Sequence, residues 1–251
     1  MDDDLPVLTP HVDAVRRAWE HLAGSSSQFS AASNPRVVVA PDSRLCPPGW
    51  CGLVVICGAT IATAPDTAQA DVLRRGLEDL LATGSTGPTP QSSSTLAHRL
   101  PVTDVLGPTD LAYLLTDLSD SSLAAASSAR PLDVASPLIQ ELLAACSPED
   151  AAEAAIDTLT SPAFVLVRGG AALAVAGYER WPGSLAHLCV ITHPMARGAG
   201  LARVVAAAAT DHALRAGLLP QWRARPTASR RLARALGYQS LGHQLSVRLA
   251  L

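Results

Sequence analysis

The residues best suited to chemistry lie between Leu185 and Gly217. A buried strand and a turn containing Pro194 lead into a glycine-rich corner, Arg197-Gly198-Ala199-Gly200-Leu201-Ala202, and then into one long helix. Small residues let consecutive backbone N–H groups face one point, and the start of the helix adds free N–H groups and the positive end of its dipole. This pattern predicts a phosphate or pyrophosphate site that needs no metal.

Two common phosphate-binding motifs do not fit this corner. A dinucleotide-binding G-x-G-x-x-G that used Gly198 and Gly200 would need its third glycine where the chain has Arg203. No acidic residue ends a strand near position 222, where a ribose would require one. A P-loop is excluded because the chain contains no lysine.

A second patch follows about thirty residues after the corner. Leu219–Ala224 reads as a short strand, and the helix from Ser229 ends in Leu-Gly-Tyr at Tyr238. With the R-x-x-G-x-A pattern that starts at Arg197, this patch resembles the GNAT superfamily of acyl-CoA-dependent N-acyltransferases, whose pyrophosphate loop is Q/R-x-x-G-x-G/A. The resemblance covers roughly residues 136–251, about half of the chain.

The order of elements supports a mixed α/β fold. From residue 136 the chain reads helix, helix, three strands, corner, helix, strand, helix and a final strand pair around Gly242. Gly169-Gly170 predicts an antiparallel hairpin, and the strand–helix–strand unit implies a parallel step. We therefore expect a GNAT-like mixed, mostly antiparallel sheet flanked by helices, with an additional N-terminal α/β lobe.

The chain divides at about residue 130. Residues 131–251 form the expected GNAT N-acyltransferase domain, and residues 1–130 form the N-terminal α/β lobe, whose strand, strand, helix order leaves open a degenerate second copy of the fold. In this lobe the patterns predict a strand over residues 53–64 and an exposed Gly/Ser/Thr/Pro-rich loop over residues 83–99.

The resemblance implies which residues bind the cofactor. In the family the strand before the corner splays from its neighbour, so its backbone near Val190, Ile191 and Thr192 would bind the pantetheine arm and polarise the thioester. The corner would bind the pyrophosphate through Arg197, Gly198, Ala199, Gly200, Leu201 and Ala202. The Arg197 and Arg203 side chains would add charge. Ser229 would approach the thiol end, or it would simply cap its helix.

The usual catalytic pair is missing. Ala186 stands where many relatives carry a glutamate base, and Ala233 stands where they carry a tyrosine acid. Glu179 and His187 are the candidate catalytic residues in the adjacent strands, because a carboxylate or an imidazole can take the proton of an attacking amine. Tyr238 is the alternative acid, although its position is that of a core aromatic residue.

The composition argues against several other classes of protein. A net charge of −3 gives no case for nucleic acid, no apolar run is long enough to span a membrane, and no cysteine or histidine spacing indicates a metal site. Five scattered cysteines and an acidic start without a signal peptide predict a cytoplasmic protein.

The resemblance implies transfer of acetyl from acetyl-CoA, or of another short acyl group, to a primary amine. The sequence does not decide whether the acceptor is a small molecule or a peptide. It also leaves open whether the protein is a monomer or a homodimer. The second interpretation is a catalytically inactive CoA-binding or interaction module of GNAT fold.

Overall fold

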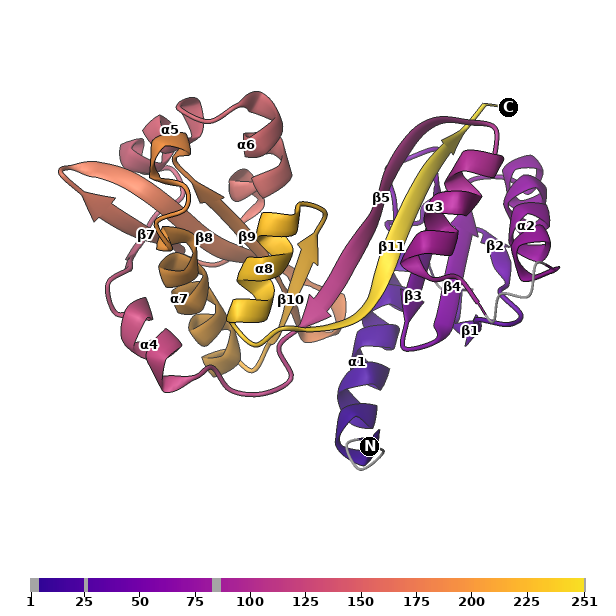
Figure 1. Ribbon diagram of the computed structural model, residues 1–251, viewed down its shortest axis with the longest axis horizontal. Helices are drawn as coiled ribbons and strands as arrows, with labels where there is room; N and C mark the ends of the chain where they lie inside the picture. Colours follow the sequence, from indigo (N-terminus) through magenta and orange to yellow (C-terminus); the bar gives the residue numbers. More distant parts are fainter. Residues whose placement is uncertain (1–4, 25–26, 83–86, 251) are drawn as a thin grey trace. The chain divides into compact units, whose positions relative to one another are not determined.

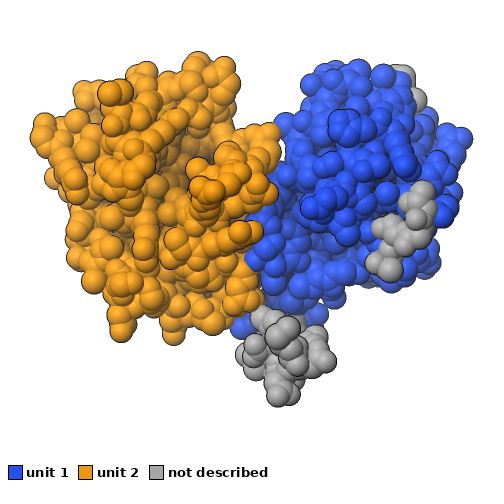
Figure 2. Space-filling model, viewed as in Figure 1, with its two compact units in different colours: residues 1–111, 240–251 blue, residues 112–239 orange. Residues whose placement is uncertain are grey.

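The computed structural model describes residues 5–24, 27–82 and 87–250, which form two compact units (Figures 1 and 2). The first unit takes in Met1–Leu111 and Ser240–Leu251, and the second takes in Ala112–Gln239. The compact division therefore falls before residue 130, and the last strand returns to the first unit. The assignment of functional domains to residues 1–130 and 131–251 stays a prediction.

The first unit is a mixed sheet covered by helices. Its elements are α1 (Leu5–Ala23), β1 (Ser30–Ala31), β2 (Val37–Val39), β3 (Cys51–Ile56), β4 (Ala59–Ala64), α2 (Thr67–Ala82), α3 (Pro90–Arg99), most of β5 (Val102–Tyr113) and nearly all of β11 (Gln239–Leu249). The strand order is β1-β4-β3-β11-β5, with β2 parallel to β4. All six residues of β3 are buried, as expected for a strand covered on both faces.

Two expectations for this unit are wrong. The predicted strand over residues 53–64 is a hairpin of β3 and β4, since Cys57 and Gly58 both have left-handed φ angles (45° and 73°) and reverse the chain. The predicted loop over residues 83–99 contains α3 in its described part. Thr89 begins that helix with a reciprocal capping box to Ser92, a signal hidden by the polar composition.

The second unit confirms the predicted mixed, mostly antiparallel sheet flanked by helices. Its elements are α4 (Asp120–Ala126), β6 (Arg130–Leu132), α5 (Pro137–Ala144), α6 (Pro148–Ala154), β7 (Ala163–Arg168), β8 (Ala171–Trp181), β9 (Leu185–Thr192), α7 (Leu201–Arg215), β10 (Leu219–Ala224) and α8 (Thr227–Ala235). The strand order is β6-β7-β8-β9-β10; only the β9–β10 step is parallel among these pairs. The predicted final strand pair is instead the single strand β11, which pairs with β3.

The two faces of this second sheet carry different helices. On the α7 face, alternate residues of β8 and β9 such as Ala176, Tyr178 and Leu188 pack against the buried alanines of α7. On the α5/α6 face, Val175 and Cys189 pack with apolar residues of α5 and α6. Because strand side chains alternate, each residue of β8, β9 and β10 can be assigned to one face.

Candidate active site

The glycine-rich corner has the open backbone that its sequence predicts. Gly198 and Gly200 have φ angles of 80° and 75°, and a Cβ at either position would meet no atom within 4 Å. In the part of the chain that the structure describes, no acceptor takes a hydrogen bond from the backbone N–H groups of residues 198–202. The corner therefore offers a run of unused donors at its surface.

The start of α7 strengthens this preference for an anion. Its N-cap is Gly200, which has no side chain to cap the helix, and its first turn contains no acidic residue. The helix runs for 15 residues, so its N-terminal dipole favours negative charge at the corner. Arg203 lies in the first turn, and its Nη2 donates to Ser122 Oγ at 3.3 Å.

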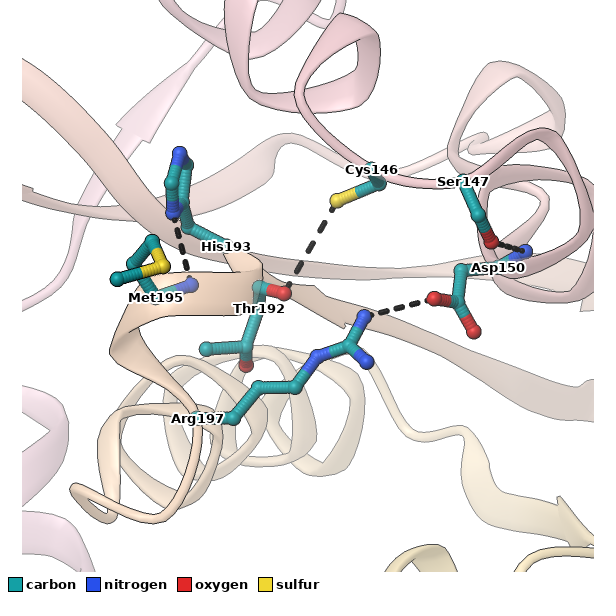
Figure 3. Close-up of polar contacts among 7 residues, drawn as sticks. All are labelled: Cys146, Ser147, Asp150, Thr192, His193, Met195 and Arg197. Atoms are coloured by element: carbon teal, nitrogen blue, oxygen red, sulfur yellow. Dashed lines mark hydrogen bonds and ion pairs between the residues drawn. The ribbon is translucent and has the colours of Figure 1, made fainter.

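The side chain of Arg197 ties the corner to the start of α6 (Figure 3). Its Nη2 lies 2.8 Å from Asp150 Oδ2, and the hydrogen bond from Arg197 lowers the pKa of that carboxyl, with the Ser147 hydroxyl adding to the effect. The backbone N–H of Arg197 donates to Pro194 O at 3.4 Å. Arg197 thus positions the corner, while the unused backbone donors begin at Gly198.

The end of β9 separates from β10, which leaves one edge of β9 unpaired. The parallel pairing joins Leu185 to Leu219 and ends at His187 and Gln221. His193 N–H donates to Leu173 O at 2.9 Å, so by alternation the backbone of Ile191 also faces β8.

Of the three residues predicted to bind pantetheine, Val190 and Thr192 direct their backbone groups to the edge that β10 leaves open, and Ile191 does not. At the corner end of β9, Cys146 Sγ donates to Thr192 O at 3.9 Å, a long contact that leaves most of this edge available (Figure 3).

The two candidate catalytic residues lie opposite each other on the α5/α6 face. Glu179 of β8 is paired in register with His187 of β9. Trp181 joins them, because its Nε1 donates to Glu179 Oε2 at 3.0 Å and its ring stacks on His187 with centroids 4.5 Å apart. Trp181 was not predicted from the sequence, although its i+2 spacing from Glu179 on a strand places both side chains on one face.

His187 is neutral at physiological pH. Burial lowers its pKa, the positive charge of Arg223 lowers it further, and the Gln221 side chain opposes the shift, giving a value of about 3. A group this acidic holds no proton at pH 7 and takes one only weakly, so Glu179 is the better placed proton acceptor of the two.

Other sequence candidates have structural partners. Ser229 lies inside α8, whose N-cap is Pro226, so the capping interpretation is wrong; its hydroxyl accepts from Trp222 Nε1 at 2.9 Å. Tyr238 is buried, its hydroxyl bonds Thr210 Oγ1 at 2.8 Å, and burial raises its pKa. These contacts indicate that Tyr238 is a core residue.

Within residues 5–24, 27–82 and 87–250, no three histidine, cysteine or acidic side chains gather where a metal could sit. In the same ranges no helix combines the length and apolar character needed to cross a bilayer.

Residues 164–243 match the family model described as GNAT acetyltransferase. No curated protein matches the chain. Among solved structures, a GNAT-family protein from Novosphingobium aromaticivorans is 18% identical with a TM-score of 0.44; the match covers 58% of this chain and 65%, less than two thirds, of that one. A GCN5-related N-acetyltransferase-like protein from Streptococcus suis is 17% identical with a TM-score of 0.47, covering 96% of this chain and 99% of that one. These structural similarities are remote, so the similarity of residues 164–243 to GNAT acetyltransferases rests on the family model alone.

Proposed function

We propose that this protein transfers an acyl group, acetyl in the simplest case, from acyl-CoA to a primary amine, because residues 164–243 match the GNAT acetyltransferase family model. The observation that carries the proposal is the run of unused N–H donors at residues 198–202, located at the uncapped start of α7. A diphosphate supplies the acceptors and the negative charge that such a corner favours.

In this proposal the open edge of β9 binds the rest of the cofactor. The backbone groups of Val190 and Thr192 are free of β10 and suit the amides of a pantetheine arm. An N–H on this edge that faces the thioester carbonyl would stabilise the negative charge that develops on its oxygen. Bound acyl-CoA supplies the activated thioester; the chain supplies orientation and hydrogen bonds.

Glu179 is the proposed general base. The amine nitrogen forms a bond to the acyl carbon as the carbon–sulfur bond breaks, and the amine must lose a proton. Glu179 is half-buried and held by Trp181 Nε1, so one of its carboxylate oxygens remains available to take that proton. His187 is assigned a positioning role as a neutral ring stacked on Trp181. Since Ala233 stands where relatives carry a tyrosine acid, no side chain is assigned to protonate the leaving thiolate.

The acceptor is proposed to be an amine of a small molecule or a peptide, used in the cytoplasm. The alternative is a CoA-binding module without transferase activity, favoured by the alanines at positions 186 and 233. Both alternatives need the same corner, so cofactor binding alone does not distinguish them.

The test combines binding and turnover. Calorimetric titration with CoA and acetyl-CoA measures occupancy of the corner, and release of free CoA thiol with a panel of primary amines measures transfer. Binding with amine-dependent thiol release is the expected result. CoA binding without thiol release on any amine would support the alternative of an inactive CoA-binding module. Absence of CoA binding would refute the proposal that the corner binds the diphosphate.

A further inference from the structure

Arg223 is a partly buried cation that lacks a hydrogen-bonded acid. Its Nε is buried without a hydrogen-bond partner, and no ion pair to it is found among the described residues. The carboxylate of Glu153 acts on it through space but forms its ion pair with Arg225. The guanidinium carbon lies 5.6 Å from the centre of the Trp181 ring, a contact that orients the cation without neutralising it.

The neighbours of Arg223 are polar side chains that contact one another. Gln221 is fully buried; its Nε2 donates to Tyr113 OH at 3.1 Å, and its side chain also interacts with that of His187, its in-register partner on β9. The Nε of Arg223 has no such neighbour among the described residues. Buried polar groups are normally satisfied, so this nitrogen is the donor that a bound acceptor would satisfy.

This cluster lies where β9 and β10 begin to separate. His187 and Gln221 are the last paired residues, and Arg223 is two residues further along β10. Trp222 and Ala224 pack on the α7 face, so Gln221 and Arg223 face the α5/α6 side with Glu179, Trp181 and His187. A ligand beside Arg223 is therefore on the same face as the proposed base and next to the open edge of β9.

We propose that Arg223 binds a carboxylate of the acyl acceptor, which makes the acceptor a small amine of amino-acid type. The inference rests on the proposed acyl transfer. The guanidinium donates to the carboxylate, while Glu179 accepts from the amine. An arginine fork matches a carboxylate in geometry and charge, and its use here would satisfy the orphaned Nε.

The experiment uses the full chain and two sets of probes. The first set is the twenty standard L-amino acids and β-alanine; the second is the corresponding amides, which keep the amine and lose the carboxylate. Thiol release from acetyl-CoA gives kcat and KM, and saturation-transfer NMR without cofactor gives direct binding. Arg223→Met and Arg223→Lys are compared with Arg180→Met, a control that removes an exposed arginine from the α7 face of β8.

At least one amino acid is expected to have a kcat/KM about tenfold or more above that of its amide. Arg223→Met lowers kcat/KM for that amino acid by about 10- to 100-fold, mainly through KM, and leaves the amide unchanged. Arg223→Lys restores part of the loss, and Arg180→Met has no effect. Equal use of acids and amides, or an equal loss on both in Arg223→Met, overturns the inference and leaves acyl transfer standing.

The direct binding measurement separates this inference from the proposed function. If acetyl-CoA does not bind, acyl transfer fails, yet amino-acid binding that Arg223→Met removes and Arg180→Met retains would still uphold the carboxylate site. If acetyl-CoA binds and no amino acid binds or is acylated, the site at Arg223 is refuted while the cofactor corner stands.

Discussion

Replacing Gly200 with glutamate tests the corner most directly. The residue has a left-handed backbone (φ 75°, ψ 3°), so any side chain there costs about 1–2 kcal/mol of folding free energy. The new Cβ meets no atom within 4 Å, so no clash adds to that cost. The glutamate lies at the positive end of α7, which offsets about 0.3–1 kcal/mol. The net loss of stability should therefore be small.

The effect on cofactor binding should be much larger. A carboxylate about 6 Å from one charge of a diphosphate costs about 3 kcal/mol at an effective dielectric constant of about 20. That is about a hundredfold in Kd. The corner is exposed, so the effect is greatest at low ionic strength and diminishes as salt screens the charges. Calorimetric titration with CoA at two salt concentrations measures both quantities.

Gly217 provides a matched control at the other end of the same helix. It also has a left-handed backbone (φ 69°) and open space around its Cβ position. Gly217→Glu carries the same strain and charge but lies beyond the other end of α7, a helix of 15 residues that is about 22 Å long. Its carboxylate at the negative end of the helix should destabilise the fold at least as much, and CoA binding should be unchanged. Equal CoA affinity in the two variants would refute the placement of the diphosphate.

Three further variants test the remaining assignments. Glu179→Gln keeps an acceptor for Trp181 Nε1 but removes the base. We expect kcat to fall by about 10²- to 10⁴-fold while the Kd of CoA is unchanged. The exposed control variant Glu149→Gln should retain activity. The pKa of His187 is about 3 in the folded state against 6.5 unfolded, so the unfolded state takes up a proton first and stability falls as pH drops from about 6.5 to 3. In urea unfolding, His187→Gln should flatten that fall, and parallel pH curves would contradict the assignment. Tyr238→Phe leaves the buried Thr210 hydroxyl unpaired and should cost about 1–3 kcal/mol in urea unfolding without moving the pH–rate profile; a lost alkaline limb would instead identify Tyr238 as an acid.

The local geometry of the corner was predictable because it depends on nearby residues. An apolar strand, Pro194, two glycines and a long helical pattern are contiguous, and the glycines adopt the left-handed angles that such a turn requires. The mixed sheet followed in the same way from hairpin glycines and from the strand–helix–strand spacing. What these elements share is that their determinants are close in sequence.

The side-chain contacts of the site were not predictable, because they depend on strand register and on distant residues. Only the pairing of β8 with β9 brings Glu179 opposite His187. The ion pair between Arg197 and Asp150 joins residues 47 positions apart. The helix α3 was missed because serine and threonine suggest loops unless a capping box is recognised, and the extra turn at Cys57 was missed because cysteine is rare at a left-handed position.

The final strand has a consequence for how the chain matures during synthesis. β11 lies between β3 and β5 in the first unit, and its Leu245, Val247 and Leu249 belong to the same apolar cluster as α2 and α3. A ribosome makes those residues only after every element of the second unit has been synthesised. Until β11 is made, the sheet of the N-terminal unit therefore lacks the strand between β3 and β5. A nascent chain stalled before residue 240 should be a target for chaperones and proteases.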